Sequence, residues 1–154
     1  MRVQVATVLL MFLLAGAGVA AAAVPPPPIA AQEPVLSTFT SGAGDEVPYR
    51  VGWYGGGSAG FGRTKVVGKH KITNDDIVGA VVRSPQTVRT ESPYVVHEKE
   101  AILVSLFGDD ERLTVRVVIN YGAWSGPGRQ GVVTAYCVGP VECPDWINRA
   151  FATD

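Results

Sequence analysis

Hydrophobic and polar residues change their spacing along the chain near residue 85. Before that point, residues 64–71 have a composition compatible with a short helix. Residues 77–82 form a second apolar run, preceded at 73–76 by an N-cap segment with two acids. Pro85 cannot continue this second helix. The pattern therefore predicts one or two short helices in this half of the chain.

β-Branched and often alternating residues follow, separated by breaks rich in turn-forming residues. A short terminal helix capped by Asp145 is compatible with residues 145–151. This order predicts an α+β domain in which one or two N-terminal helices pack on a four- to five-stranded antiparallel sheet. The expected strands are residues 87–90, 94–99, 101–107, 113–120 and 131–137.

The N-terminus has the pattern of a secretory signal peptide over residues 1–23. A basic Arg2 precedes an apolar run at 5–14, and small residues occupy 18–23. The apolar run is short for a spanning helix and prolines follow at 25–28, so a retained membrane anchor is the weaker alternative. We therefore expect a secreted, extracellular protein with no stable membrane association after signal cleavage.

Residues 24–48 are rich in Pro, Ala, Ser and Gly without a hydrophobic period, which predicts a flexible spacer. Residues 49–154 are then a single globular α+β domain. The glycine-rich stretch at 55–62 lacks the pattern of a phosphate-binding loop. Closely packed backbone or simple flexibility is the expected reason for those glycines.

The charge balance and the cysteines limit the chemistry. Loss of Arg2 with the signal leaves 12 basic and 14 acidic side chains, so a strong overall field for nucleic acid is absent. In an oxidising compartment Cys137 and Cys143 are expected to form a disulfide, the alternative being two free thiols. Their spacing, without a partnering His or Cys, argues against zinc, and we expect neither a metal nor a cofactor.

Two groups of polar residues are candidates for chemistry. His70 lies beside Lys69 and near Lys65, and these cations should lower the pKa of the histidine and favour its neutral form. Thr134 and Tyr136 alternate to the same face of the last expected strand. The alternatives are a solvated surface histidine and an ordinary sheet surface.

A second histidine and two glutamates lie together on another expected strand. For His97, which Glu98 and Glu100 follow closely, a solvated strand-surface residue is the favoured interpretation, and a part in the chemistry is the alternative. The two glutamates are spaced like the acidic pair of ADP-ribosyltransferases. The upstream Arg and Ser-Thr-Ser strand of those enzymes are missing, so a charged exposed turn is the favoured interpretation.

The order of these features over residues 61–137 resembles the barnase–EndoU–colicin–RelE group of ribonuclease toxins. The resemblance rests on the Lys-rich segment with His70, the helix ending in Ser-Pro, the run of strands and the Val-Val-Thr-Ala-Tyr sequence at 132–136. It implies that His70 acts as general base or acid, that Lys65 or Lys69 steadies the phosphate, and that Thr134 and Tyr136 line the site. EndoU-type members carry a second histidine in the helical region, whereas here the other histidine lies on a strand.

The resemblance also implies a function. A toxin of this group cleaves RNA, in some cases tRNA, without a metal, and its producer needs an immunity protein. Attack by the RNA's own 2′-hydroxyl requires a base, an acid and a cation near the phosphate, which His, Tyr and Lys side chains can supply. The alternative is a non-enzymatic extracellular binding or inhibitor domain that uses a sheet face or the loop at 121–124, and the near-neutral charge favours it.

Overall fold

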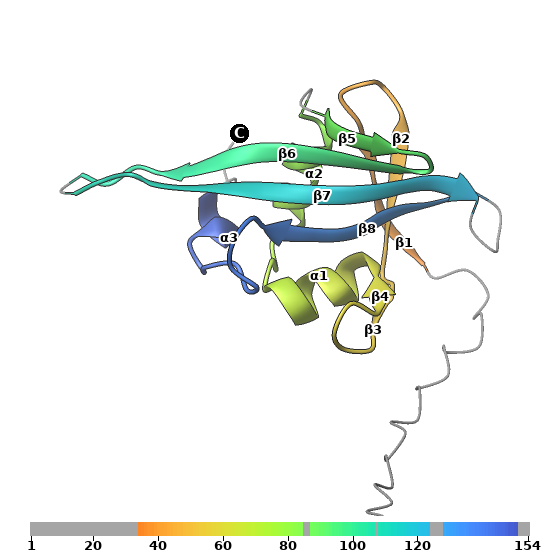
Figure 1. Ribbon diagram of the computed structural model, residues 1–154, viewed down its shortest axis with the longest axis horizontal. Helices are drawn as coiled ribbons and strands as arrows, with labels where there is room; N and C mark the ends of the chain where they lie inside the picture. Colours follow the sequence, from red (N-terminus) through yellow and green to blue (C-terminus); the bar gives the residue numbers. More distant parts are fainter. Residues whose placement is uncertain (1–33, 85–86, 107, 124–127, 151–154) are drawn as a thin grey trace, which may run out of the picture.

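The computed structural model describes residues 34–84, 87–106, 108–123 and 128–150. Its main feature is a four-stranded antiparallel sheet in the order β5-β6-β7-β8, which confirms the expected α+β class. Along this sheet β6 and β7 extend beyond their neighbours as a two-stranded arm (Figure 1). The strands are β5 (Thr87–Glu91), β6 (Tyr94–Leu103), β7 (Glu111–Ala123) and β8 (Arg129–Cys137).

Helices and two small sheets surround this sheet. Helix α2 packs on β6 and β7, while α1 runs along β8 at the edge of the sheet (Figure 1). The helices are α1 (Gly62–His70), α2 (Asp75–Val82) and α3 (Ile147–Ala150). The small sheets pair β1 (Val35–Thr40) with β2 (Glu46–Arg50) and β3 (Trp53–Tyr54) with β4 (Gly60–Phe61).

The register of β6, β7 and β8 gives the main sheet one buried and one more open face. Val117 pairs with His97 on one side and with Ala135 on the other, and all three are buried. Since side chains alternate along a strand, the neighbouring residues point to the other face. The buried face packs against the apolar side of α2, whose buried members are Ile77, Val78, Val81 and Val82.

The prediction of a flexible spacer over residues 24–48 is wrong for residues 35–48, which belong to a β-hairpin. Residues 35–40 and 46–50 pair as an antiparallel hairpin, and Val47 is fully buried in the core. The hairpin lies tightly against β8, because a Cβ on Gly131 would lie 1.9 Å from the Pro48 carbonyl oxygen. Residues 24–33, like the expected signal peptide at 1–23, lie outside the described residues.

The order of the elements also differs from the expectation. Four short strands precede α1, so the helices do not begin the described part of the chain. The two strands expected at 94–99 and 101–107 are one strand, because β6 pairs with β7 without interruption from Tyr94 to Leu103. Asn74 caps α2 as expected, and its side chain accepts a hydrogen bond from the Asp76 N–H.

Close packing of the backbone explains part of the glycine-rich stretch, whereas Gly56 and Gly57 have open space where a Cβ would lie. Gly60 has φ +109°, and a Cβ there would lie 2.1 Å from the Trp53 carbonyl oxygen. Only glycine fits this conformation and this approach. Within the described ranges, none of the helices has the length and apolar character needed to cross a membrane.

Candidate functional site

A row of three polar side chains crosses the open face of the main sheet. The strand register places Arg116 of β7 between Glu98 of β6 and Tyr136 of β8. The Arg116 guanidinium forms an ion pair with the Glu98 carboxylate, and its Nη1 donates a hydrogen bond of 3.2 Å to the Tyr136 hydroxyl. Its Cζ lies 5.7 Å from the centroid of the Tyr136 ring. Glu98 thus orients Arg116, which in turn contacts both the ring and the hydroxyl of the tyrosine.

His70 adds an imidazole to the β8 end of this row. It is the last residue of α1, and its ring centroid lies 5.5 Å from that of Tyr136. The structure therefore brings together the histidine and the tyrosine that the sequence pattern selected separately. His70 is only 7% exposed, so the alternative interpretation of a solvated surface histidine does not hold.

The surroundings of His70 favour its neutral form. Burial lowers its pKa most, the nearby charges of Lys69 and Lys65 lower it further, and the hydrogen bond to the Val141 carbonyl opposes them in part. His70 Nδ1 lies 3.0 Å from the Val141 carbonyl oxygen. A carbonyl oxygen can only accept, so Nδ1 carries the proton. In the neutral ring, Nε2 then holds the lone pair that a general base requires.

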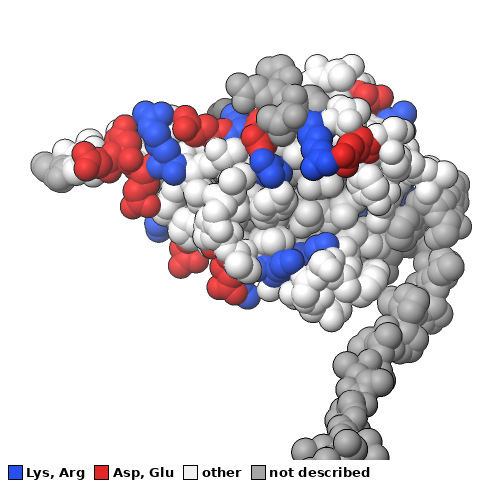
Figure 2. Space-filling view, viewed as in Figure 1, with Lys and Arg blue, Asp and Glu red and all other residues white. Residues whose placement is uncertain are grey.

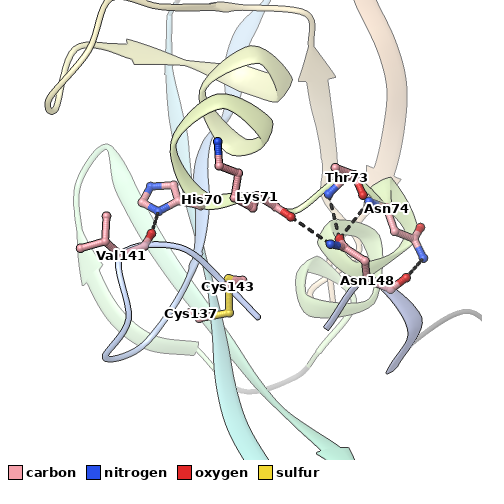
Figure 3. The surroundings of a disulfide bond; sticks show 8 residues. All are labelled: His70, Lys71, Thr73, Asn74, Cys137, Val141, Cys143 and Asn148. Carbon is pink, nitrogen blue, oxygen red and sulfur yellow. Dashed lines mark hydrogen bonds between the residues drawn. A yellow bond between two sulfur atoms is a disulfide. The ribbon is translucent and has the colours of Figure 1, made fainter. Parts of the chain in front are cut away.

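The turn after α1 is held by Asn148 of α3. Lys71 ends α1 in the left-handed conformation, with φ 59°, and its N–H donates to the Val67 carbonyl. Asn148 Nδ2 donates to the Lys71 carbonyl over 2.9 Å, while Asn148 Oδ1 accepts from the Thr73 N–H over 2.8 Å (Figure 3). A left-handed residue other than glycine costs energy, and these bonds fix it. The end of α1 that carries His70 is therefore well defined.

The two lysines selected from the sequence have different surroundings. Lys65 is buried, and its Nζ donates to the carbonyl oxygens of Ser58 and Gly60 over 2.7 and 3.0 Å. Burial, and next the charge of Lys69, lowers the pKa of Lys65. Its ammonium group therefore holds the glycine-rich loop beside α1. Lys69 is half-buried and directly precedes His70, and its charge is one of the causes that lower the pKa of the histidine.

Thr134 lies on β8, two residues before Tyr136 and opposite Val118. Its Oγ1 is buried and has no hydrogen-bond partner among the described residues. The hydroxyl is thus shielded from solvent in this structure, while the tyrosine hydroxyl is engaged by Arg116.

His97 is wrongly placed by the sequence interpretation. It is 4% exposed, lies on the buried face of the sheet, and its Nδ1 is 3.3 Å from the Ser84 carbonyl oxygen. Side chains alternate along β6, so His97 and Glu98 point to opposite faces although they are adjacent in the sequence. His97 is therefore separated from the row that contains Glu98.

The sequence pattern does not identify Glu98 and Arg116 as site residues. Glu98 was interpreted as part of an exposed turn, yet its side chain is only 17% exposed. The available signal was Arg116 itself, a charged residue between Val115 and Val117 in an otherwise apolar run of β7. Such a residue must find a partner on a neighbouring strand, but the sequence alone does not give the register that selects Glu98.

The charged side chains form no single basic patch on the face shown in Figure 2. Lys and Arg are interspersed with Asp and Glu over the body, and acidic side chains gather toward the tip of the β6–β7 arm. No group of three or more His, Cys, Asp or Glu side chains in the described part of the chain is arranged to hold a metal ion.

We define the candidate site as Glu98, Arg116, Tyr136 and His70, flanked by Lys69 and Thr134. Neither a protein-family model, nor a curated protein, nor a solved structure matches this chain.

Proposed function

We propose that this protein is a secreted, metal-independent endoribonuclease of the toxin type, which cleaves RNA by attack of the RNA's own 2′-hydroxyl. The observation that carries the proposal is the contact between the His70 and Tyr136 rings at the end of the Glu98–Arg116–Tyr136 row. It combines an imidazole base, a guanidinium and a phenolic hydroxyl within one site. The disulfide of the chain is compatible with an extracellular location.

In the proposed reaction His70 is the general base. Its Nε2 takes the proton of the 2′-hydroxyl, and the 2′-oxygen forms a bond to phosphorus. The neutral state needed for this step is favoured by the burial and neighbouring cations that lower the pKa of His70. The P–O5′ bond breaks as the Tyr136 hydroxyl gives its proton to the departing oxygen. The products are a 2′,3′-cyclic phosphate and a 5′-hydroxyl. His70 then releases the proton it took to solvent, and solvent returns a proton to Tyr136.

Arg116 and Lys69 supply the positive charge for the phosphate. A guanidinium held by a carboxylate keeps further N–H donors for phosphate oxygens, and its planar geometry suits two oxygens at once. Lys65 is left out of this role, since two carbonyl oxygens already accept from its Nζ. The resemblance allowed either lysine, and the contacts favour Lys69.

The proposal is tested by incubating the purified protein with total RNA and with tRNA in the presence of a chelator. We expect cleavage with 2′,3′-cyclic phosphate ends, because base, acid and cation are all side chains. His70→Ala should lower the rate by roughly two to four orders of magnitude. RNA that stays intact for hours at high protein concentration would exclude the proposed activity.

A binding or inhibitor domain is the second candidate, and a different feature favours it. The arm formed by β6 and β7 exposes several large apolar side chains near its tip, and such clusters mark interaction sites. Val104 is 69% exposed and Leu106 is 86% exposed, with Ile102 and Leu103 beside them. In a toxin, this arm could instead be the surface that an immunity protein covers. Intact RNA together with partner binding that is lost on Leu106→Ser would favour the second candidate.

A further inference from the structure

The loop closed by the disulfide touches His70 at two points. The sulfur atoms of Cys137 and Cys143 are bonded, as the sequence predicted, and the Cα atoms lie 5.5 Å apart. The Val141 carbonyl oxygen lies 3.0 Å from His70 Nδ1 (Figure 3). In addition, the Cys143 N–H donates to the His70 carbonyl over 2.9 Å. One short loop therefore contacts both the backbone and the ring of the same histidine.

Besides its contacts with His70, the loop is tied to the domain by a hydrogen bond of 2.9 Å from the Val138 N–H to the Thr114 carbonyl and by an exposed ion pair between Glu142 and Lys71. All residues between the two cysteines, at positions 138–142, are exposed, and Val141 is 70% exposed. Val141 thus contributes its carbonyl oxygen to the site and directs its side chain to solvent. By contrast, Cys137 and Cys143 are buried and belong to the core cluster. The covalent bond between them holds the ends of an otherwise exposed loop, and this fixes where the Val141 carbonyl can lie.

The loop also decides which ring nitrogen of His70 carries the proton. In water a neutral imidazole exchanges between its two tautomers, and a hydrogen-bond acceptor beside one nitrogen selects one of them. The Val141 carbonyl selects the tautomer with the proton on Nδ1, which leaves the lone pair on Nε2. If the loop opened, this selection would be lost and the imidazole could turn away from Tyr136.

We propose that the Cys137–Cys143 loop, acting through the Val141 carbonyl, is the positioning element of His70, and that reduction of the disulfide switches the site off. A dithiol reductant would donate two electrons and two protons, so both cysteines become thiols and the reductant becomes a disulfide. This inference rests on the proposed function for its effect on rate, although its effect on the histidine ring does not. It makes the site competent only after the chain has reached an oxidising compartment.

The direct test is nitrogen NMR of the purified protein labelled in its histidines, before and after reduction by dithiothreitol. His70→Gln assigns the signals. In the oxidised protein we expect His70 to be protonated at Nδ1 alone. After reduction the two ring nitrogens of His70 should show chemical shifts averaged between the two tautomers. The ring nitrogens of His97, whose Nδ1 faces the Ser84 carbonyl, should keep their chemical shifts. The matched control is Val141→Ala, which retains the carbonyl and should leave the His70 tautomer unchanged.

The rate of RNA cleavage is the second readout. We expect kcat to fall about 10- to 100-fold on reduction, because small losses of alignment at a catalytic group have effects of this size. Cys137→Ala with Cys143→Ala should reproduce the loss and make the protein insensitive to dithiothreitol. If the tautomer shifts but the oxidised protein cleaves no RNA, the positioning role holds and the proposed function fails.

Two results would overturn the inference. One is a His70 tautomer that stays the same in the reduced protein. The other is a simultaneous change at His70 and His97 with loss of the far-ultraviolet circular dichroism, which would make the disulfide a general fold-stabilising bond.

Discussion

Arg116 and Tyr136 lie on neighbouring strands, and the guanidinium of the first contacts both the hydroxyl and the ring face of the second. A planar guanidinium can make both contacts while its Nε faces the Glu98 carboxylate. A lysine ammonium has no fork of N–H groups and cannot hold the tyrosine and the carboxylate in this way. The geometry of the row therefore depends on arginine and not merely on positive charge.

The first prediction concerns this dependence. Arg116→Lys should lower kcat/KM for RNA cleavage by about 100- to 1000-fold, the range expected when one donor to a developing charge is lost. Arg112→Lys is the matched control, because Arg112 lies on the same strand, is exposed and pairs with Glu100 outside the site. Its activity should equal that of the unaltered protein. Full activity in Arg116→Lys would mean that positive charge alone suffices, and equal losses in both variants would mean that the loss is not specific to the site.

The second prediction concerns stability and pH. The pKa of His70 is lowered in the folded protein, mainly by burial, so the unfolded chain takes up the proton first as the pH falls. Stability should therefore fall as the pH drops below the unfolded value of about 6.5, until the folded pKa is reached. Urea unfolding at pH 8 and pH 5 measures this change. His70→Gln should lose less stability over that interval, and equal losses would contradict the lowered pKa.

The activity should follow the same titration. A base must be neutral, so the rate of RNA cleavage should rise with pH and reach its plateau with an apparent midpoint below the usual histidine value of about 6.5. Lys69→Gln removes one of the nearby cations and should move this midpoint upward. An unchanged midpoint in that variant would show that Lys69 does not act on the histidine.

The fourth prediction separates the two lysines. Lys65→Met keeps the aliphatic stem but leaves the Ser58 and Gly60 carbonyls without their charged donor. The free energy of unfolding should fall by about 1.5–3 kcal/mol, the usual contribution of hydrogen bonds to a charged group. Lys69→Met should leave stability nearly unchanged and raise KM for RNA. If Lys65→Met raised KM for RNA and Lys69→Met lowered the free energy of unfolding, Lys65 would be the residue that contacts the phosphate.

Features set by local sequence were predictable. The N-cap at Asn74 and the short cysteine loop need only a few neighbouring residues, and both are present. The shared face of Thr134 and Tyr136 follows from simple alternation along one strand. His70 could be selected because its cationic neighbours are also its sequence neighbours.

Features set by pairing between distant segments were not predictable. The β1–β2 hairpin has no clear alternation, and its position depends on the close approach of Pro48 to Gly131, far along the chain. Glu98 joins the site only through the register of β6 with β7. The burial of His97 depends on which face of β6 packs against α2, and the pleat of the strand separates His97 from Glu98.

The last prediction tests the hairpin that replaced the expected spacer. Removing residues 34–47 deletes Val47, which is fully buried, and Phe39, whose ring lies 5.7 Å from that of Tyr49. Full burial of Val47 contributes about 1.5–3 kcal/mol, and the partly buried Phe39 adds to it. For a domain of this size the loss should lower Tm by more than about 10 °C. The matched control is a chain that begins at Pro34, which keeps every described contact and should retain the Tm of the longer protein. If the chain beginning at Pro48 melts at the same temperature as the one beginning at Pro34, the hairpin adds nothing to the stability of the core.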